Sequence, residues 1–191
     1  GDNLLPINVG VGRTVTDFAM ALYSVCAVLD NGDTKCWGYA PHGQRGSEDT
    51  IAKGGAPGDM AALTPLNLGT GRNAVKLYSG GSYHYCAKLD NDDIKCWGYN
   101  GHGNLGRKEY GGNRGDEPGE MGDSLVAIDF GTKTLISPLM MSIYSACGIF
   151  DNEQMHCWGY GGLGILGTGS TGAHGGAASH MGDNMPAALL W

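Results

Sequence analysis

The cysteines are the residues in this sequence whose chemistry is easiest to anticipate. The chain has six of them, in three pairs whose members are ten positions apart: Cys26 with Cys36, Cys86 with Cys96, and Cys147 with Cys157. If the members of a pair face each other across a short β-hairpin, their Cα atoms lie about 4.5 to 5.5 Å apart, within the range that a disulfide accepts. We therefore expect three disulfides, each local to its own hairpin, and an oxidising compartment. Buried free thiols are the alternative, and a zinc site fits poorly because the short C-x2-C spacing is absent.

Few other residues suggest a reaction. His42 and His102 occupy equivalent glycine-rich turns, which favours a role in turn stability over acid–base catalysis. The acidic run at 90–93 falls in a predicted hairpin loop and lacks the spacing and terminal glutamate of a calcium loop. The tripeptide 114–116, Arg-Gly-Asp, is short enough to occur by chance. We expect no catalytic residue, no metal site and no cofactor.

The composition limits the fold class and the partners. The chain has 191 residues, of which 35 are glycine, well above the usual share of about 7%. This many glycines disfavours a helix bundle, because glycine costs about 1 kcal/mol in a helix interior. The formal net charge of −7 disfavours nucleic acid and anionic membranes as partners. No apolar run is long enough for a membrane-spanning helix, which needs about 18 residues.

The sequence repeats with a period of about 60 residues. Cys26, Cys86 and Cys147 lie 60 and 61 positions apart, and the second cysteine of each pair follows the same steps. A Gly-Asp pair recurs at 1–2, 58–59, 122–123 and 182–183. We therefore read 1–191 as a single repeat domain with units at about 1–57, 58–121 and 122–181, and with the start of a fourth repeat at 182–191.

Each unit is predicted to hold about four short strands. In the second unit these are 65–68, 74–78, 83–90 and 93–99, with turn residues between them. When Cys26 opposes Cys36, residues 30–32 form a three-residue loop in which Gly32 takes the left-handed position. Strand alternation then places Cys26 and Cys36 on one face and Trp37 on the other, and both faces are apolar. A sheet that is apolar on both sides needs a neighbour on each, as in a propeller. The predicted fold is all-β, with propeller-type blades of four-stranded antiparallel sheets.

The recurring sequence motif resembles the repeat of a known family. The pattern Cys-Ala-x-Leu-Asp-Asn, followed by Cys-Trp-Gly-Tyr and by spaced glycines, occurs at 26–46 and 86–106, and more loosely at 147–167. It is similar to the repeat of the regulator of chromosome condensation family, whose units close into a seven-bladed propeller of four-stranded blades. This chain departs from the family in its three blades and its paired cysteines. Closed propellers have about four to eight blades, so we expect further blades or other subunits to complete the ring. The apolar segment 187–191 is predicted to be an exposed edge strand that pairs with another chain, giving a ring or a filament.

Two further sets of residues follow from the repeat. The structural frame is predicted to consist of the cysteine pairs with Trp37, Trp97, Trp158, Gly32, Gly38, Gly98 and Gly159. The loops 47–57, 107–121 and 168–181 differ from copy to copy, and such insertions on a repeat scaffold commonly carry the binding surface. The candidate interaction residues in these loops are Glu48, Arg107, Tyr110, Arg114, Asp116 and His174.

These observations favour a non-enzymatic, secreted or cell-surface module that acts in assembly or adhesion. Its partner is expected to be protein, either other copies of the chain or another chain, through edge strands and long loops. One alternative is an intracellular regulatory propeller, since the best-known member of the family promotes nucleotide exchange on a small GTPase. Another alternative is a carbohydrate-binding propeller.

Overall fold

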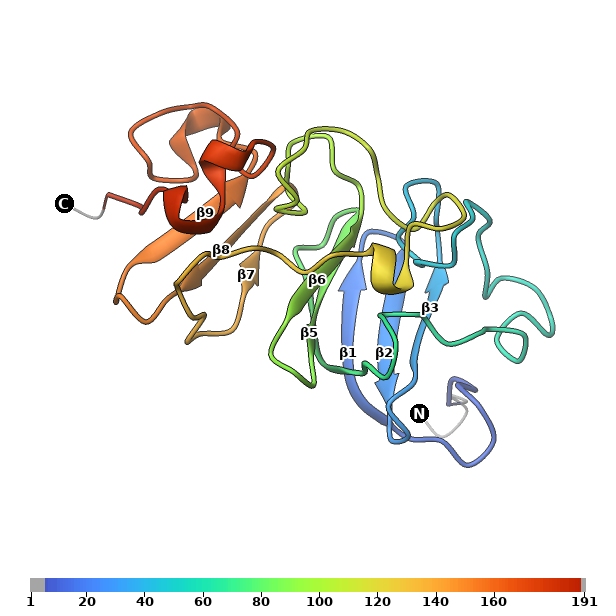
Figure 1. The fold of residues 1–191 in the computed structure, drawn as a ribbon. Helices are drawn as coiled ribbons and strands as arrows, with labels where there is room; N and C mark the ends of the chain where they lie inside the picture. Colours follow the sequence, from blue (N-terminus) through green and yellow to red (C-terminus); the bar gives the residue numbers. More distant parts are fainter. Residues whose placement is uncertain (1–5, 190–191) are drawn as a thin grey trace.

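The protein is built from three antiparallel sheets that follow one another along the chain. The computed structural model describes residues 6–189, and within this range each sheet has three strands in sequential order (Figure 1). The strands of the first blade are β1 (Val15–Ala21), β2 (Ser24–Leu29) and β3 (Thr34–Gly38). Those of the second blade are β4 (Ala74–Ser79), β5 (His84–Leu89) and β6 (Ile94–Gly98). Those of the third blade are β7 (Met140–Met141), β8 (Ser145–Ile149) and β9 (Met155–Gly159).

Only short 3-10 turns accompany these strands. They are η1 (Gly122–Ser124), η2 (Gly162–Gly164), η3 (Ala178–His180) and η4 (Gly182–Asn184). Across residues 6–189, none of the helical segments has the length and hydropathy needed to cross a bilayer. The all-β prediction is confirmed.

The hairpin register is the one that the cysteine spacing predicts. Cys26 pairs with Cys36 across β2 and β3, and the equivalent cysteines pair in the other two blades. All three pairs form disulfides, with Cα–Cα distances of 4.0 to 4.1 Å. Gly32 takes the left-handed loop position with φ of 87°, and Asp92 and Glu153 take it in the other hairpins at 68° and 61°.

The fourth strand of each blade does not form as a strand. The segment 65–68, predicted as the first strand of the second unit, runs instead along the edge of the first blade, where Leu66 N donates to Thr34 O at 2.7 Å. The same single hydrogen bond joins Ile128 to the second blade at 2.7 Å and Ala188 to the third at 2.8 Å. These contacts, with one isolated bridge added at the third blade, do not extend into a paired strand, so each sheet of the described residues has three strands rather than four.

The segment 187–191 was predicted to be an unpartnered edge strand. Residues 190–191 lie outside the described residues, as does the first Gly-Asp pair at 1–2. The described part contacts the third blade, since Ala187 bridges to His156 and Ala188 donates to Met155 O. Within the described residues, 187–189 are therefore not an unpartnered strand.

The sheets stack face to face in a row. One buried apolar cluster joins the first and second blades, and another joins the second and third. In Figure 1 the first blade stands at one end of the row and the third at the other, with the second between them. Each blade therefore buries its faces only where it has a neighbour.

Candidate interaction surface

A sheet in this protein has two distinct faces, which we define by their marker residues. The front face carries the tryptophan of the repeat, and the back face carries the disulfide. In the first blade the register places Val25 beside Trp37 on the front face, and Cys26 beside Cys36 on the back face. The front face of each later blade packs against the back face of the blade before it, so the internal junctions show what each face is built to bind.

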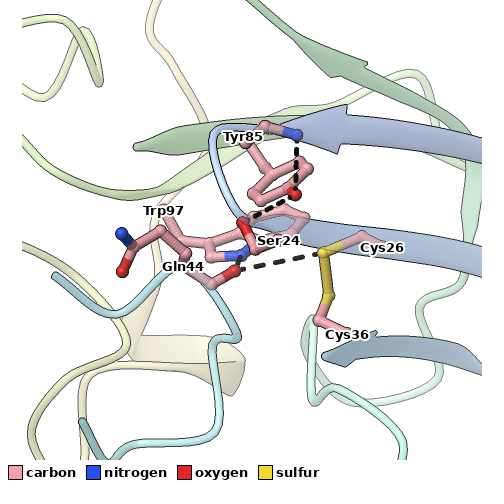
Figure 2. Close-up of a disulfide and its surroundings, with 7 residues drawn as sticks. Ser24, Cys26, Cys36, Gln44, Tyr85 and Trp97 are labelled. Atoms are coloured by element: carbon pink, nitrogen blue, oxygen red, sulfur yellow. Dashed lines mark hydrogen bonds between the residues drawn. A yellow bond between two sulfur atoms is a disulfide. The ribbon is translucent and has the colours of Figure 1, made fainter. Parts of the chain in front are cut away.

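The junction between the first two blades is sealed by Trp97. Its side chain is fully buried, and its indole Nε1 donates to the carbonyl oxygen of Gln44 at 3.0 Å. The Cys26 sulfur lies 3.9 Å from the same carbonyl oxygen. Figure 2 shows this arrangement, with the Trp97 ring beside the Cys26–Cys36 disulfide of the preceding blade. The tryptophan therefore anchors one blade to the backbone of its neighbour.

Tyr85 supports the same junction. Its ring stacks on Trp97 with centroids 5.8 Å apart, and its hydroxyl accepts a hydrogen bond from Ala21 N at 3.0 Å. A second hydrogen bond joins this hydroxyl to Ser24 Oγ at 3.0 Å (Figure 2). Burial raises the pKa of Tyr85 to about 12, so the phenol stays protonated at physiological pH.

The junction between the second and third blades repeats this plan. Trp158 is fully buried, and its Nε1 donates to the carbonyl oxygen of Asn104 at 3.2 Å. Asn104 stands at the position of Gln44, eight residues after the preceding cysteine of its repeat. Two junctions with different side chains thus use the same indole-to-carbonyl hydrogen bond.

A backbone hydrogen bond accompanies the tryptophan at each junction. Glu48 N donates to Gly115 O at 2.9 Å, and Lys108 N donates to Gly175 O at 2.8 Å. Both acceptor glycines are buried and have positive φ, 92° and 97°. A Cβ on Gly115 would lie 2.7 Å from the Cα of Gly46, so this close approach of the two backbones requires glycine.

The front face of the first blade has no such neighbour among the described residues. Trp37 is only half-buried there, and Phe18 and Met20 are 62% and 61% exposed. The face forms an almost entirely apolar hollow of about 360 Å³, whose lining residues are Ile7, Val9, Val15, Phe18, Met20, Val25, Ala27 and Trp37. Monomeric proteins rarely leave a contiguous apolar surface of this kind, which marks the face as a candidate binding surface.

The back face of the third blade is open as well. Met140 and Ile149 lie on it with Cys147, and they are 72% and 45% exposed. Ile165 follows its cysteine by eight residues, as Gln44 and Asn104 do, and is 54% exposed. The two ends of the row thus expose the two kinds of face that the internal junctions bury.

The predicted interaction loops mainly bind their own chain. The Glu48 carboxylate accepts from the backbone N–H groups of Gly119 and Met121 at 3.0 and 2.9 Å, which ties the first loop to the second. The Tyr110 hydroxyl donates to Ala173 O at 2.8 Å, which ties the second loop to the third.

The charged side chains of the second loop pair with one another. Arg107 contacts Glu109 at 3.1 Å, and Arg114 is bonded to both Glu109 and Glu120 with its side chain only 19% exposed. Asp116 accepts from Asn113 at 3.2 Å. The Arg-Gly-Asp tripeptide is therefore held within the loop rather than displayed.

His174 lies inside the third loop. Its ring stands 4.8 Å from that of His180, and burial lowers its pKa. The recurring glycines of the frame have a separate role: Gly38, Gly98 and Gly159 have φ near 100°, and a Cβ on any of them would collide with the backbone at the start of the strand with which it pairs.

An aromatic row runs across all three blades, and we call it the tyrosine rim. It consists of side chains from equivalent turns of the three repeats, whose successive ring centroids lie 4.9 to 6.5 Å apart. The members are Tyr23, Tyr39, His42, Tyr83, Tyr99, His102, Tyr144 and Tyr160. His42 contacts two tyrosines of the second blade, and His102 contacts two tyrosines of the third, so each links its own turn to the next blade. The rim was not predicted from the sequence, although Tyr39, Tyr99 and Tyr160 recur at the repeat spacing and could have indicated it.

Metal ligation finds no support in the geometry. Within residues 6–189, no three histidine, cysteine or acidic side chains gather into a group able to hold a metal ion.

Comparison with known proteins identifies the repeat. Residues 75–104 match the family model described as the regulator of chromosome condensation (RCC1) repeat. The fold is similar to that of human WBSCR16, with a TM-score of 0.59 and 15% identity over 88% of this chain and 40% of that one. It is also similar to Prp20p of Saccharomyces cerevisiae, with a TM-score of 0.58 and 18% identity over 86% of this chain and 35% of that one. The predicted resemblance is thus confirmed, and the chain spans two fifths or less of the length of these proteins.

Proposed function

We propose that this protein is a non-enzymatic, extracellular interaction module of RCC1-like repeats that acts in assembly or adhesion. The observation that carries the proposal is the open front face of the first blade, where apolar side chains surround a half-buried Trp37. The same face on the second blade is fully buried, with Tyr85 and Trp97 at 0% exposure. A face of this composition gains free energy when another protein covers it.

The disulfides support the extracellular part of the proposal. All six cysteines are paired, one disulfide to each blade. Disulfides of this kind persist in oxidising environments and are rare where glutathione keeps thiols reduced. Intact-mass measurement of the native protein, with and without reductant, tests this directly: we expect a gain of two hydrogens per disulfide on reduction, and a native protein that is already reduced would contradict the proposal.

Photo-crosslinking tests the binding face. A benzoylphenylalanine at Phe18 places the reactive group on the front face, and the same group at Val126, which is 54% exposed away from this face, serves as the control. The purified protein is irradiated alone and with extracellular proteins of its source, and the crosslinked products are identified by mass spectrometry. We expect crosslinks from position 18 that excess unlabelled protein suppresses and that excess Phe18→Lys protein does not. Crosslinks from position 126 alone, or none that compete, would refute the proposal.

The tyrosine rim favours carbohydrate binding as a second candidate function. Tyr23, Tyr39 and Tyr160 are 72%, 42% and 41% exposed, and they combine an apolar ring with a polar hydroxyl. A glycan array compares the unmodified chain with a Tyr23→Ala, Tyr39→Ala double variant. Binding of a glycan that the double variant loses would support this function, and an array without a hit would dismiss it.

A regulatory role of the nucleotide-exchange type is the remaining alternative. Prp20p was described together with its binding properties to Gsp1p and histones. For this chain the likeness supports the fold, whereas the three disulfides disfavour a reducing nucleus and the net charge of −7 disfavours chromatin. A pull-down with a small GTPase tests it, and we expect no retention.

A further inference from the structure

We infer that the open front face of the first blade binds the back face of the third blade of a second copy of this chain. This inference rests on the proposed function, since it names the partner of the same face. The two internal junctions carry the inference, because both use the same set of contacts between a front face and a back face. Among the described residues, the front-face partners of this set are uncovered on the first blade and the back-face partners are uncovered on the third.

The first contact in the set is the indole hydrogen bond. Trp97 donates to Gln44 O and Trp158 to Asn104 O, at 3.0 and 3.2 Å. Trp37 is the third tryptophan of the series and has no such acceptor among the described residues. The carbonyl that continues the acceptor series belongs to Ile165, at the other end of the molecule. A second copy would therefore place Trp37 Nε1 against Ile165 O.

The second contact is the backbone hydrogen bond to a left-handed glycine. Gly54 is the equivalent of Gly115 and Gly175 in the first repeat. Each of the three glycines directly follows the loop residue that bridges to the last glycine of its hairpin, and Gly54 has the same left-handed conformation, with φ of 102°. Gly115 and Gly175 are buried by the preceding blade, whereas Gly54 is exposed. The donor that corresponds to Glu48 N and Lys108 N is Gly169 N, which is exposed on the third blade.

The third contact is a close approach of two glycine-rich turns. Gly43 and Gly103 are buried, and a Cβ on either would meet the backbone of the next loop, at Asp116 N (2.7 Å) and at Gly176 N (2.5 Å). Gly164 holds the same position and nearly the same φ, 73°, yet within residues 6–189 a Cβ there would meet no atom within 4 Å. This turn has the shape of a junction turn without a neighbouring blade.

The apolar surfaces match in the same way. Inside the molecule, the cysteines and Val28 of one back face pack against Tyr85, Leu77 and Trp97 of the next front face. At the ends, Met140, Ile149 and Met155 form the back face, and Phe18, Met20 and Trp37 form the front face. Such a contact joins different surfaces of the two copies, so it is head-to-tail and propagates into a ring or a filament.

Complementary variants test this pairing. Phe18→Lys disables the front face and Ile149→Lys disables the back face, and both residues are exposed, so the fold should persist, as circular dichroism would verify. By analytical ultracentrifugation over a range of concentrations, we expect the unmodified chain to form dimers and larger species. Each variant alone should associate at least about thirtyfold more weakly, the change that a hot-spot residue produces. Val126→Lys is the matched control and should associate like the unmodified chain.

Mixing the variants separates head-to-tail pairing from a symmetric dimer. Phe18→Lys keeps an intact back face and Ile149→Lys an intact front face, so an equimolar mixture should form heterodimers and nothing larger. A front-to-front dimer would instead persist in Ile149→Lys alone, and that result would overturn the inference. An unmodified chain that stays monomeric would also overturn it.

The outcomes also separate this inference from the proposed function. A monomeric chain whose position 18 crosslinks competitively to a different protein would leave the function standing and refute the second-copy partner. A monomeric chain without competitive crosslinks would refute both.

Discussion

Acid should destabilise this protein through His84, and the effect can be assigned by one substitution. His84 lies in β5 with 0% exposure, and among the described residues neither of its ring nitrogens has a hydrogen-bond partner. Burial alone lowers the pKa of the folded-state imidazole from 6.5 to about 4. In the unfolded chain the same side chain regains its ordinary pKa of about 6.5.

The direction and size of the effect follow from this difference. Between pH 6.5 and about 4 the unfolded chain binds a proton that the folded chain does not, so the free energy of unfolding falls as the pH falls through this window. Well above pH 6.5 the imidazole is neutral in both states and contributes no pH dependence to the free energy of unfolding. At the lower end of the window the loss reaches about 3 kcal/mol, because one pKa unit corresponds to about 1.4 kcal/mol. His156 and His174, whose pKa values burial also lowers, add smaller losses of the same sign.

The first and third blades supply the substitution. Ser24 and Ser145 hold the register position of His84, opposite the glycine that ends the hairpin. We expect His84→Ser to lower stability at about pH 7.5 through lost packing, yet to lose about 2 to 3 kcal/mol less than the unmodified protein on transfer to about pH 4.5. Urea unfolding at both pH values measures this difference. Leu77→Ala, in the same sheet and without a titratable group, is the control and should keep the original pH dependence. An unchanged pH dependence in His84→Ser would refute the reasoning.

Two further predictions concern the disulfides and the tryptophans. Replacing Cys86 and Cys96 with alanine should lower the free energy of unfolding by about 2 to 4 kcal/mol, because the unfolded chain gains conformational freedom. Thermal unfolding followed by circular dichroism measures this loss, and an unchanged melting temperature would contradict the prediction. Trp97→Phe should lower the free energy of unfolding by about 2 kcal/mol or more, since it leaves the buried carbonyl of Gln44 without a donor. Trp37→Phe should change the stability of the monomer by less than about 0.5 kcal/mol. Equal losses in the two variants would show that the indole hydrogen bond is not what distinguishes the junction.

The sequence predicts the hairpins because two local constraints agree there. A ten-residue spacing between Cys26 and Cys36 and a loop that ends in Gly32 allow a single register, and that register fixes which side chains share a face. The prediction of a fourth strand in each sheet was wrong because the repeat pattern does not show which sheet a segment joins. Leu66 follows the loop of the first unit and bonds to Thr34 of the blade before it, which is a contact between units that a period of 60 residues leaves undetermined.

The surface was harder to predict because sequence variation has two physical causes. The loops 47–57, 107–121 and 168–181 differ between copies, which the sequence suggested as the mark of a binding surface. In the structure Glu48, Tyr110 and Arg114 of these loops form contacts within the chain. The open front face, in contrast, has the composition of a core, and it is a surface because none of the residues at 6–189 covers it. Periodicity locates such residues but does not show which copies are covered.

The backbone hydrogen bonds at the junctions explain how the loops can vary while the junctions stay alike. At the positions of Glu48 and Lys108 the junction uses the backbone N–H group, and the acceptors at Gln44 and Asn104 are backbone carbonyls. A hydrogen bond from or to the backbone places no demand on the side chain at that position, provided that the glycines which allow the close approach remain. A copy that docks on Trp37 would therefore need the right glycines and one carbonyl in the right place rather than a particular loop sequence. Substitution of Gly164 by asparagine, which tolerates a left-handed φ of 73° far better than a β-branched residue does, should accordingly block association without unfolding the monomer, because its Cβ would meet none of the described atoms within 4 Å until a second copy arrives.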